Sequence, residues 1–396
     1  MHYVLAIDVA KEKSMGTLIS SCGEVLIDPY EFNHSKQDFS SLLVRIKKLN
    51  IKDVSVIMES TGIYHRPVER FFLENHFKVY VINPLYSKNH KNSLRKTKTD
   101  KLDCLSLAEL FFTHTFREVV KPSELYLNMN ALSRQYFALS ESTIDLKNRY
   151  KNLLYLCFPE YEKIFVGNMV YSDIALSFIS QYPHPEIISK TRLCFLQTFF
   201  KRKKFRYWKS KTTKIKEIAN TSYPSVNYND EIVANLSQIA KIINNQQNNI
   251  NIVKEKLINF AKCTPYFTPI NSINGIGEFT TAIIIAELGD INRFNNIKEL
   301  TAYCGLDPTI KQSGKTINTH GPISKSGNKY MRHILFLSAL NIVRITSLSK
   351  KENDIEIYYR KKRNEGKHHY VATIATIAPT TKLLRKIFAV CKQINK

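Results

Sequence analysis

The sequence has no pair of cysteines in C-x-x-C spacing. Its seven cysteines are isolated, at positions 22, 104, 157, 194, 263, 304 and 391. An odd number of separated thiols argues against a zinc site and a disulfide framework, and reduced cysteines in a cytoplasmic protein explain it most simply. No stretch approaches the roughly twenty apolar residues of a membrane span, and the N-terminus shows no signal-peptide pattern. We therefore expect no membrane anchor.

Acidic residues are scarce relative to basic ones. Asp and Glu number 34 against 58 Lys and Arg, which gives a net charge of +24 and a pI near 9.6. Such a surplus favours a polyanionic partner, and nucleic acid is the leading candidate. We expect a cytoplasmic, nucleoid-associated protein of a bacterium or archaeon. With 396 residues, 43% of them apolar, the chain can form two or three domains with ordinary cores.

Four of the acids stand out by position. Asp8 lies inside an apolar run that predicts a buried strand, and Glu59 ends a second such run. Asp100 and Asp103 are three apart, so they share one face of a helix. Taken singly, Glu59 could cap the following turn and Asp100 could cap a helix. Together on a basic protein, the four carboxylates indicate Mg²⁺- or Mn²⁺-dependent chemistry on nucleic acid.

The order of predicted elements matches a ribonuclease H-like α/β domain. Strands are predicted at 3–9, 15–20, 24–30, 54–58 and 78–82, and helices at about 36–49, 64–75 and 100–113. In that fold the centre of the first strand lies beside the end of the fourth, and a late helix packs across both. The four acids would then converge.

Two later segments have heptad spacing and predict long helices. The first contains Leu132, Tyr136, Leu139, Thr143, Leu146, Tyr150, Leu153 and Cys157, and the second contains Ile232, Leu236, Ile239, Ile243, Gln246, Ile250, Val253, Leu257 and Phe260. This periodicity is typical of coiled-coil seams. A seam between two subunits and two helices packed within one subunit are equally good interpretations.

Two basic segments are candidates for nucleic-acid binding. Residues 201–216 contain nine cations and no acid, interleaved with aromatic side chains that could stack on unpaired bases. Residues 86–101 contain six cations and one acid, and could hold a DNA backbone near the metal site. A solvated surface is the simpler explanation for each. The candidate contacts in these segments are Lys96, Lys98, Lys101, Arg202, Lys203, Lys204, Arg206 and Trp208.

The last third of the chain contains two motifs. Gly275-Ile-Gly277 opens an apolar helix and resembles a helix-hairpin-helix element, whose glycines let backbone amides approach a phosphate. Downstream, Gly305-Leu-Asp-Pro precedes Gln-Ser313-Gly-Lys and the segment 321–332. The cations at Lys315, Lys325 and Arg332 are further candidate contacts.

These motifs, in this order, resemble the insertion-sequence-110 family of transposases, also called the 116/110/902 group. The resemblance covers residues 1–113 and 265–345. It implies a RuvC-like domain with its metal-binding acids at Asp8, Glu59, Asp100 and Asp103. It also implies a C-terminal transposase domain whose nucleophilic serine falls on Ser313, with Ser324 and Ser326 in reserve.

The resemblance further implies a recombinase guided by a structured RNA that pairs with donor and target DNA. Acids and serine would come from different protomers of a dimer or tetramer. We accordingly expect a catalytic domain at 1–125, a helical coiled-coil connector with a basic segment at 126–264, and a mostly α-helical transposase domain at 265–396.

Two other functions fit the residues. A junction-resolving endonuclease would use the same acids with water as nucleophile and would form no protein–DNA adduct. A non-catalytic nucleic-acid-binding protein would use the acids only for capping and pairing. Ser313 beside a glycine is by itself an ordinary turn residue.

Overall fold

The computed structural model describes residues 2–51, 53–84, 100–119, 123–313, 317–349, 353–366 and 377–394; the side chains of Asp100 and of 310–322 lie outside this description. The chain divides into two compact units, Met1–Lys121 and Pro122–Lys396, each of which is described separately. No helix in the described residues is long and apolar enough to cross a membrane. The three-part division expected from the sequence stays a prediction.

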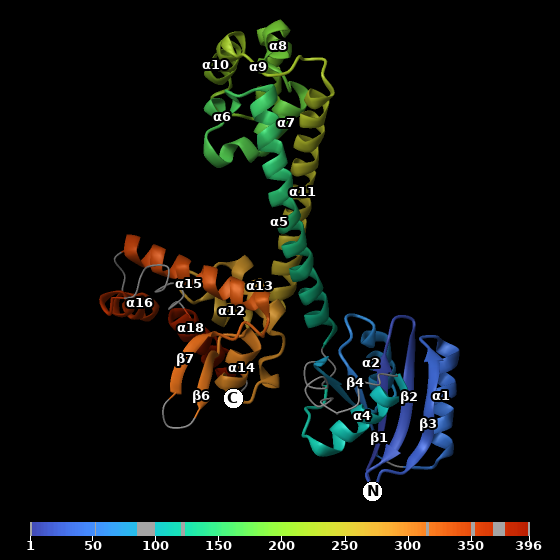
Figure 1. The fold of residues 1–396 in the computed structure, drawn as a ribbon. Helices are drawn as coiled ribbons and strands as arrows, with labels where there is room; N and C mark the ends of the chain where they lie inside the picture. Colours follow the sequence, from blue (N-terminus) through green and yellow to red (C-terminus); the bar gives the residue numbers. More distant parts are fainter. Residues whose placement is uncertain are drawn as a thin grey trace. The chain divides into compact units, whose positions relative to one another are not determined.

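The first unit is built on one five-stranded sheet (Figure 1). Its strands, in chain order, are β1 Tyr3–Val9, β2 Lys13–Ser20, β3 Val25–Asn33, β4 Val54–Glu59 and β5 Lys78–Ile82. The order across the sheet is β3-β2-β1-β4-β5. β2 runs antiparallel to β1 and β3, whereas β1, β4 and β5 are parallel. The mixed α/β domain and the adjacency of first and fourth strands predicted from the sequence are therefore confirmed.

Helices cover both faces of this sheet. Alternate residues of a strand point to opposite faces, and accordingly Leu5 and Ile7 of β1 join one buried cluster while Val4 and Ala6 join another. The first cluster includes apolar residues of α1 (Lys36–Lys48) and α2 (His65–Glu74). The second includes residues of α4 (Asp100–Thr113). The elements begin and end within three residues of their predicted bounds.

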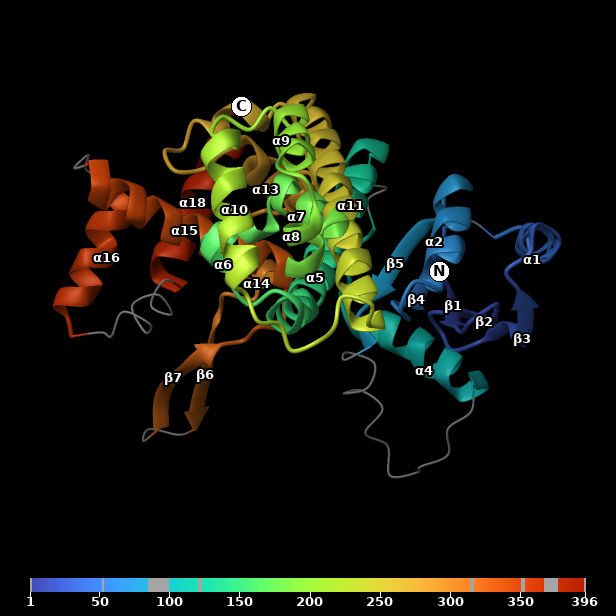
Figure 2. The same cartoon turned by 90° about the horizontal axis from the view of Figure 1, so that it is seen from above.

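In the second unit, two long helices pack along each other. α5 spans Glu124–Cys157 and α11 spans Glu231–Lys262. Figures 1 and 2 both show them side by side. Gln246, the polar residue of the second heptad run, donates from Nε2 to the Ser142 hydroxyl over 2.7 Å. The two helices with heptad spacing therefore pack against each other within one chain, whereas a coiled-coil seam between subunits stays a prediction.

Short helices form a cap on one end of this pair. They are α6 Tyr161–Ile164, η1 Gly167–Tyr171, α7 Asp173–Gln181, α8 Pro185–Lys190, α9 Leu193–Arg202 and α10 Trp208–Thr221. The core that joins them to α5 and α11 includes the fully buried aromatic side chains of Tyr161, Phe178 and Phe200. The cap lies between the two segments with heptad spacing.

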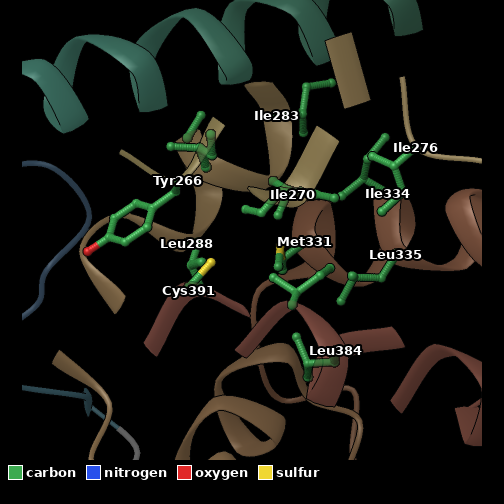
Figure 3. Close-up of a cluster of buried hydrophobic side chains, with 14 of the residues drawn as sticks. Tyr266, Ile270, Ile276, Ile283, Leu288, Met331, Ile334, Leu335, Leu384 and Cys391 are labelled. Carbon is green, nitrogen blue, oxygen red and sulfur yellow. The ribbon is translucent and has the colours of Figure 1, made fainter. Parts of the chain in front are cut away.

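The C-terminal part of the second unit is helical apart from one hairpin. Its elements are α12 Phe267–Asn271, α13 Glu278–Leu288, η2 Ile291–Arg293, α14 Ile297–Cys304, β6 Pro308–Ser313, β7 Ile317–Ile323, α15 Lys329–Ser349, α16 Asp354–Asn364 and α18 Ile377–Gln393. Figure 3 shows α13, α15 and α18 side chains meeting in its core. The β6–β7 hairpin projects away from the helices (Figures 1 and 2).

Candidate functional site

Asp8 and Glu59 lie at the same edge of the first unit's sheet. β1 and β4 are parallel neighbours, and Ile7 pairs with Met58. The next residue of each strand is an acid, so the two carboxylates follow a shared register position. Neither acid is fully buried. The sequence predicted this pairing from the expected fold alone.

The beginning of α4 meets β1 at this edge. Asp8 pairs across the sheet with Met15 of β2. The Met15 carbonyl accepts a hydrogen bond from the Cys104 thiol over 3.1 Å. Asp103 precedes Cys104, and Asp100 begins the helix one turn earlier. The hydrogen bond thus fixes the acidic end of α4 against the strand residue beside Asp8.

The acids also share one face of the sheet. Asp8 has the strand parity of Val4 and Ala6, which belong to the cluster under α4. Glu59 has the parity of Ile57, another member of that cluster. On α4, Leu107 lies four residues after Asp103 and points into the same cluster. The strand alternation in β1 and β4 and the i, i+4 spacing on α4 therefore all point Asp8, Glu59 and Asp103 toward the α4 face of the sheet.

The described side chains do not complete a metal centre. Among the residues that the structure describes, no group of three or more His, Cys, Asp or Glu is arranged to hold a metal ion. The side chain of Asp100 lies outside that set. The donor chemistry fits a hard cation, since carboxylate oxygens are the ligands that Mg²⁺ and Mn²⁺ prefer.

A buried histidine that the sequence analysis did not single out follows the turn after Glu59. His65, the first residue of α2, is 6% exposed, and its Nε2 lies 3.7 Å from the Glu69 carboxylate. Burial lowers the pKa of His65, and the nearby Arg66 lowers it further, while Glu69 raises it. A histidine at i and a glutamate at i+4 was the sequence signal available for this pair.

Ser313 ends strand β6 of the projecting hairpin. Its backbone pairs with Ile317 at the start of β7. The sequence offered Ser313 as the candidate nucleophile, with an ordinary turn residue as the alternative, and the structure places it as the last residue of a strand. Lys315, Lys96 and Lys98 lie outside the described residues.

The two arms of this hairpin are joined at their base by a backbone ladder. The amides of Ser324, Lys325 and Asn328 donate to the carbonyls of Asp307, Gly305 and Tyr303 over 2.8, 3.2 and 2.7 Å respectively. The backbones approach so closely that a Cβ on Gly327 would lie 2.4 Å from the Gly305 nitrogen. Neither glycine therefore tolerates a side chain, and we call residues 303–307 and 324–328 together the hairpin base.

Other polar groups in or next to the hairpin base make local hydrogen bonds. Ser324 Oγ accepts from the Ser326 amide over 3.4 Å, and Lys325 has a left-handed φ of 55°. The Arg332 guanidinium donates to the Cys304 carbonyl over 2.8 Å. Burial raises the pKa of the Asp307 carboxyl.

The two glycines before α13 have different surroundings. A Cβ on Gly275 would lie 2.6 Å from the Ile342 side chain of α15, and Asn341 Nδ2 donates to the Gly275 carbonyl over 2.9 Å. Gly277, the N-cap of α13, has no atom near its Cβ position. Close packing explains Gly275, and only Gly277 leaves space for a phosphate.

The cap's cations divide into two groups. Lys203 pairs with Asp173 over 2.9 Å, and Lys211 and Lys216 donate to the carbonyls of Ile164 and Thr191. These three hold cap helices together. The side chains of Arg202, Lys204 and Arg206 are exposed, as is Lys101 in the first unit, and Trp208 is partly exposed. The guanidinium of Arg206 lies 5.6 Å from the ring centre of its neighbour Tyr207.

Comparison with known proteins identifies the family. A model for DEDD transposases of the IS110 type, described as "Transposase", matches residues 5–159. A second, described as "Transposase IS116/IS110/IS902 family", matches residues 268–353. Together the two matches span more than half of the chain. The chain belongs to this transposase family. The resemblance recognised in the sequence motifs is thereby confirmed.

Relatives are similar along most of the chain. The pilin gene-inverting protein of Moraxella bovis is 24% identical over 316 residues, which cover 78% of this chain and 74% of that protein. The IS1111A transposase of Coxiella burnetii is 23% identical, covering 86% and 78% respectively. The uncharacterized IS110 protein of Streptomyces coelicolor is 24% identical, covering 70% and 67%.

A solved structure of T. thermophilus RuvC with a Holliday junction substrate also matches. It is 12% identical, covers 30% of this chain and all of its own, and has a TM-score of 0.23, which is too low to support a conclusion. Membership of a transposase family makes the protein a DNA-processing enzyme and identifies DNA as the polyanion expected from its charge.

Proposed function

We propose that this transposase cuts and exchanges DNA strands of an insertion sequence by using an acid-bound divalent cation and the hydroxyl of Ser313. The observation that carries the proposal is the shared edge of β1 and β4. There Asp8 and Glu59 follow one register position, and the Cys104–Met15 hydrogen bond brings the acidic end of α4 alongside.

Asp8, Glu59, Asp100 and Asp103 would hold Mg²⁺ or Mn²⁺. A bound divalent cation supplies neutralisation of phosphate charge and lowers the pKa of a coordinated hydroxyl or water. The packed cluster of β1, β4 and α4 side chains next to these acids would supply their rigid frame.

Ser313 would attack a DNA phosphate. The serine oxygen forms a bond to phosphorus, the bond to one deoxyribose oxygen breaks, and that oxygen takes a proton as it leaves. One phosphodiester replaces another, so strand exchange needs no external energy source. The absence of a Gly-x-x-x-x-Gly-Lys-Ser/Thr phosphate loop agrees with this chemistry. The projection of the hairpin from its helices supports a role for Ser313 in contacting DNA.

The choice of target would be made by an element-encoded RNA, as the family resemblance implies. The cap's exposed cations and Tyr207, 64% exposed beside Arg206, support contact with phosphates and unpaired bases. The remaining candidate contacts are Lys96, Lys98, Lys101, Gly277, Lys315, Lys325 and Arg332. Assembly as a dimer or tetramer belongs to the same proposal.

Two single substitutions test the chemistry. Wild type, Ser313→Ala and Asp8→Asn are incubated with Mg²⁺, the copurifying RNA and a duplex spanning one end of the element, and products are resolved on denaturing gels. We expect a covalent protein–DNA adduct from wild type only, with losses of at least about 1000-fold in each variant.

Other outcomes separate the alternatives. An adduct that survives Ser313→Ala would reject Ser313, and Ser324→Ala and then Ser326→Ala would be compared next. Cleavage with free ends and no adduct would favour an endonuclease that uses water. Binding without cleavage by wild type would favour a non-catalytic protein.

A further inference from the structure

Glu287 is a fully buried carboxylate in an otherwise apolar helix. It lies in α13, where every residue from Thr281 to Leu288 is buried, and its side chain is 0% exposed. A charge in such a place is costly unless hydrogen bonds and an opposite charge compensate it. The partners of this carboxylate therefore show which parts of the fold it joins.

Two of its partners come from the long helix α5. Ser133 Oγ donates to Glu287 Oε1 over 2.7 Å, and Arg134 Nη2 lies 2.7 Å from Oε2. The Arg134 guanidinium also stacks on Tyr330 of α15, with its Cζ 3.8 Å from the ring centre. These contacts fix α5 to both α13 and α15.

A third partner comes from the hairpin base. Asn328 Nδ2 donates to Glu287 Oε2 over 2.8 Å and to the Tyr303 hydroxyl over 2.9 Å. The Tyr303 hydroxyl in turn donates to the Glu287 carbonyl over 2.8 Å. The other amide atom of Asn328, Oδ1, caps α15 by accepting from the Tyr330 and Met331 amides, each over 3.0 Å.

A continuous path of contacts thus leads from α5 to the serine hairpin. It passes from Arg134 and Ser133 through Glu287 to Asn328, and then along the ladder of the hairpin base to the first strand pair, Pro308 with Ile323. Ser313 lies at the far end of the strand that begins there.

We propose that Glu287 is a positioning residue for the transposition reaction: its carboxylate, held by Ser133 and Arg134, orients the Ser313 hairpin on α5 through Asn328. This inference rests on the proposed role of Ser313. Misplacing a reacting group by about 1 Å can cost on the order of 100-fold in rate, so a defect in this link slows the chemical step without weakening DNA binding.

Replacing the Asn328 amide by a carboxylate tests the contact between Glu287 and the hairpin base. Asn328→Asp retains a helix cap, since Asp caps as well as Asn, but it sets a second carboxylate against that of Glu287. We expect adduct formation to slow by about 10- to 100-fold in a single turnover, with the Kd for DNA unchanged. The double variant Glu287→Gln/Asn328→Asp removes the repulsion between the two carboxylates, but its new amide nitrogen also faces the Arg134 guanidinium, which shares Oε2 with Asn328 in wild type. We therefore expect partial recovery, to a rate clearly above that of Asn328→Asp.

Glu356→Gln is the matched control. Glu356 is 4% exposed, pairs with Arg360 one turn along α16, and lies outside the described path from α5 to the hairpin. It therefore loses a buried carboxylate–arginine pair without touching the hairpin base. We expect its adduct rate to stay near that of wild type even where its melting temperature falls as far as that of Asn328→Asp.

The result that would overturn the proposal is an equal slowing in Glu356→Gln and Asn328→Asp, or no recovery in the double variant. Hydrogen exchange of the β6 and β7 amides separates this proposal from the proposed chemistry. Asn328→Asp should speed exchange there and the double variant should partly restore it, whether or not Ser313 is the nucleophile. Unchanged exchange in Asn328→Asp would reject the positioning role by itself.

Discussion

The two carboxylate sites of this protein are built in opposite ways. In the first unit, Asp8 and Glu59 follow one register position at two partly exposed strand ends, and the end of α4 that carries Asp103 lies beside β1. In the second unit, Glu287 is fully buried and is satisfied by Ser133, Arg134 and Asn328. Gathered like charges favour binding of a cation, whereas a compensated buried charge fixes packing.

Removing the Glu287 carboxylate should have the largest effect on stability. Glu287→Ala removes the carboxylate that accepts hydrogen bonds from Ser133 and Asn328, and leaves Arg134 without its counter-charge. Loss of one partner of a buried pair costs about 3–5 kcal/mol, and Arg134, with a side chain 39% exposed, brings the expected loss to about 3 kcal/mol. Urea unfolding of the full chain measures it.

If Glu287→Ala destabilised the protein no more than Asp8→Asn does, the proposed contrast between the buried Glu287 site and the acidic strand ends would be wrong. Asp8→Asn removes one of several like charges from a partly exposed edge, so we expect its free energy of unfolding without metal to match or slightly exceed that of wild type.

A divalent cation should stabilise wild type more than Asp8→Asn. Wild type should gain about 2.7 kcal/mol when Mg²⁺ is present at roughly 100 times its Kd, since the ion binds only the folded acids. Asp8→Asn should gain much less, and Glu287→Gln should gain as much as wild type. Thermal unfolding with Mg²⁺ or with EDTA measures these shifts, and an equal gain in wild type and Asp8→Asn would reject Asp8 as a ligand.

The sequence predicted one of these sites better than the other, for a physical reason. Asp8 lies inside an apolar strand and Glu59 ends another, and such strands are visible in the sequence as short apolar runs. The convergence of their strands follows from the order of elements. Glu287 also interrupts an apolar run, yet its partners lie 41 and 153–154 residues away. No local spacing indicates such contacts.

In the Ser313 hairpin and in the cap, too, the deciding contacts join residues that are far apart in the sequence. Lys311-Gln-Ser-Gly-Lys suggested a turn, whereas the contacts between residues 303–307 and 324–328 that join the two arms at their base have no local signal in the sequence. In the cap, nine cations in sequence looked alike. Lys203, Lys211 and Lys216 differ from the others only because Asp173 and the ends of two other helices approach them in space.

Asp173 in the cap combines features of both sites, because its carboxylate is paired but exposed. Its replacement should have the smallest effect on stability. Burial acts to raise its pKa, but hydrogen bonds from Asn244 and Lys203 outweigh it and hold the pKa below 3.8. A depressed pKa in the folded protein stabilises it above the unfolded pKa near 4, and this stabilisation is lost as pH falls through the folded value. Because the Asp173 side chain is 54% exposed, solvent screening reduces it to under about 1 kcal/mol.

Asp173→Asn should therefore lower stability slightly at pH 7, and the difference should disappear over the acidic range in which the folded carboxyl, with its lowered pKa, becomes protonated. Urea unfolding of both proteins across this range measures the difference. Asp173 thus shares with Glu287 a compensated charge and with Asp8 an exposed position. If Asp173→Asn lowered the free energy of unfolding as much as Glu287→Ala does, the hydrogen-bond and charge partners of a carboxylate would matter more for stability in this fold than its burial.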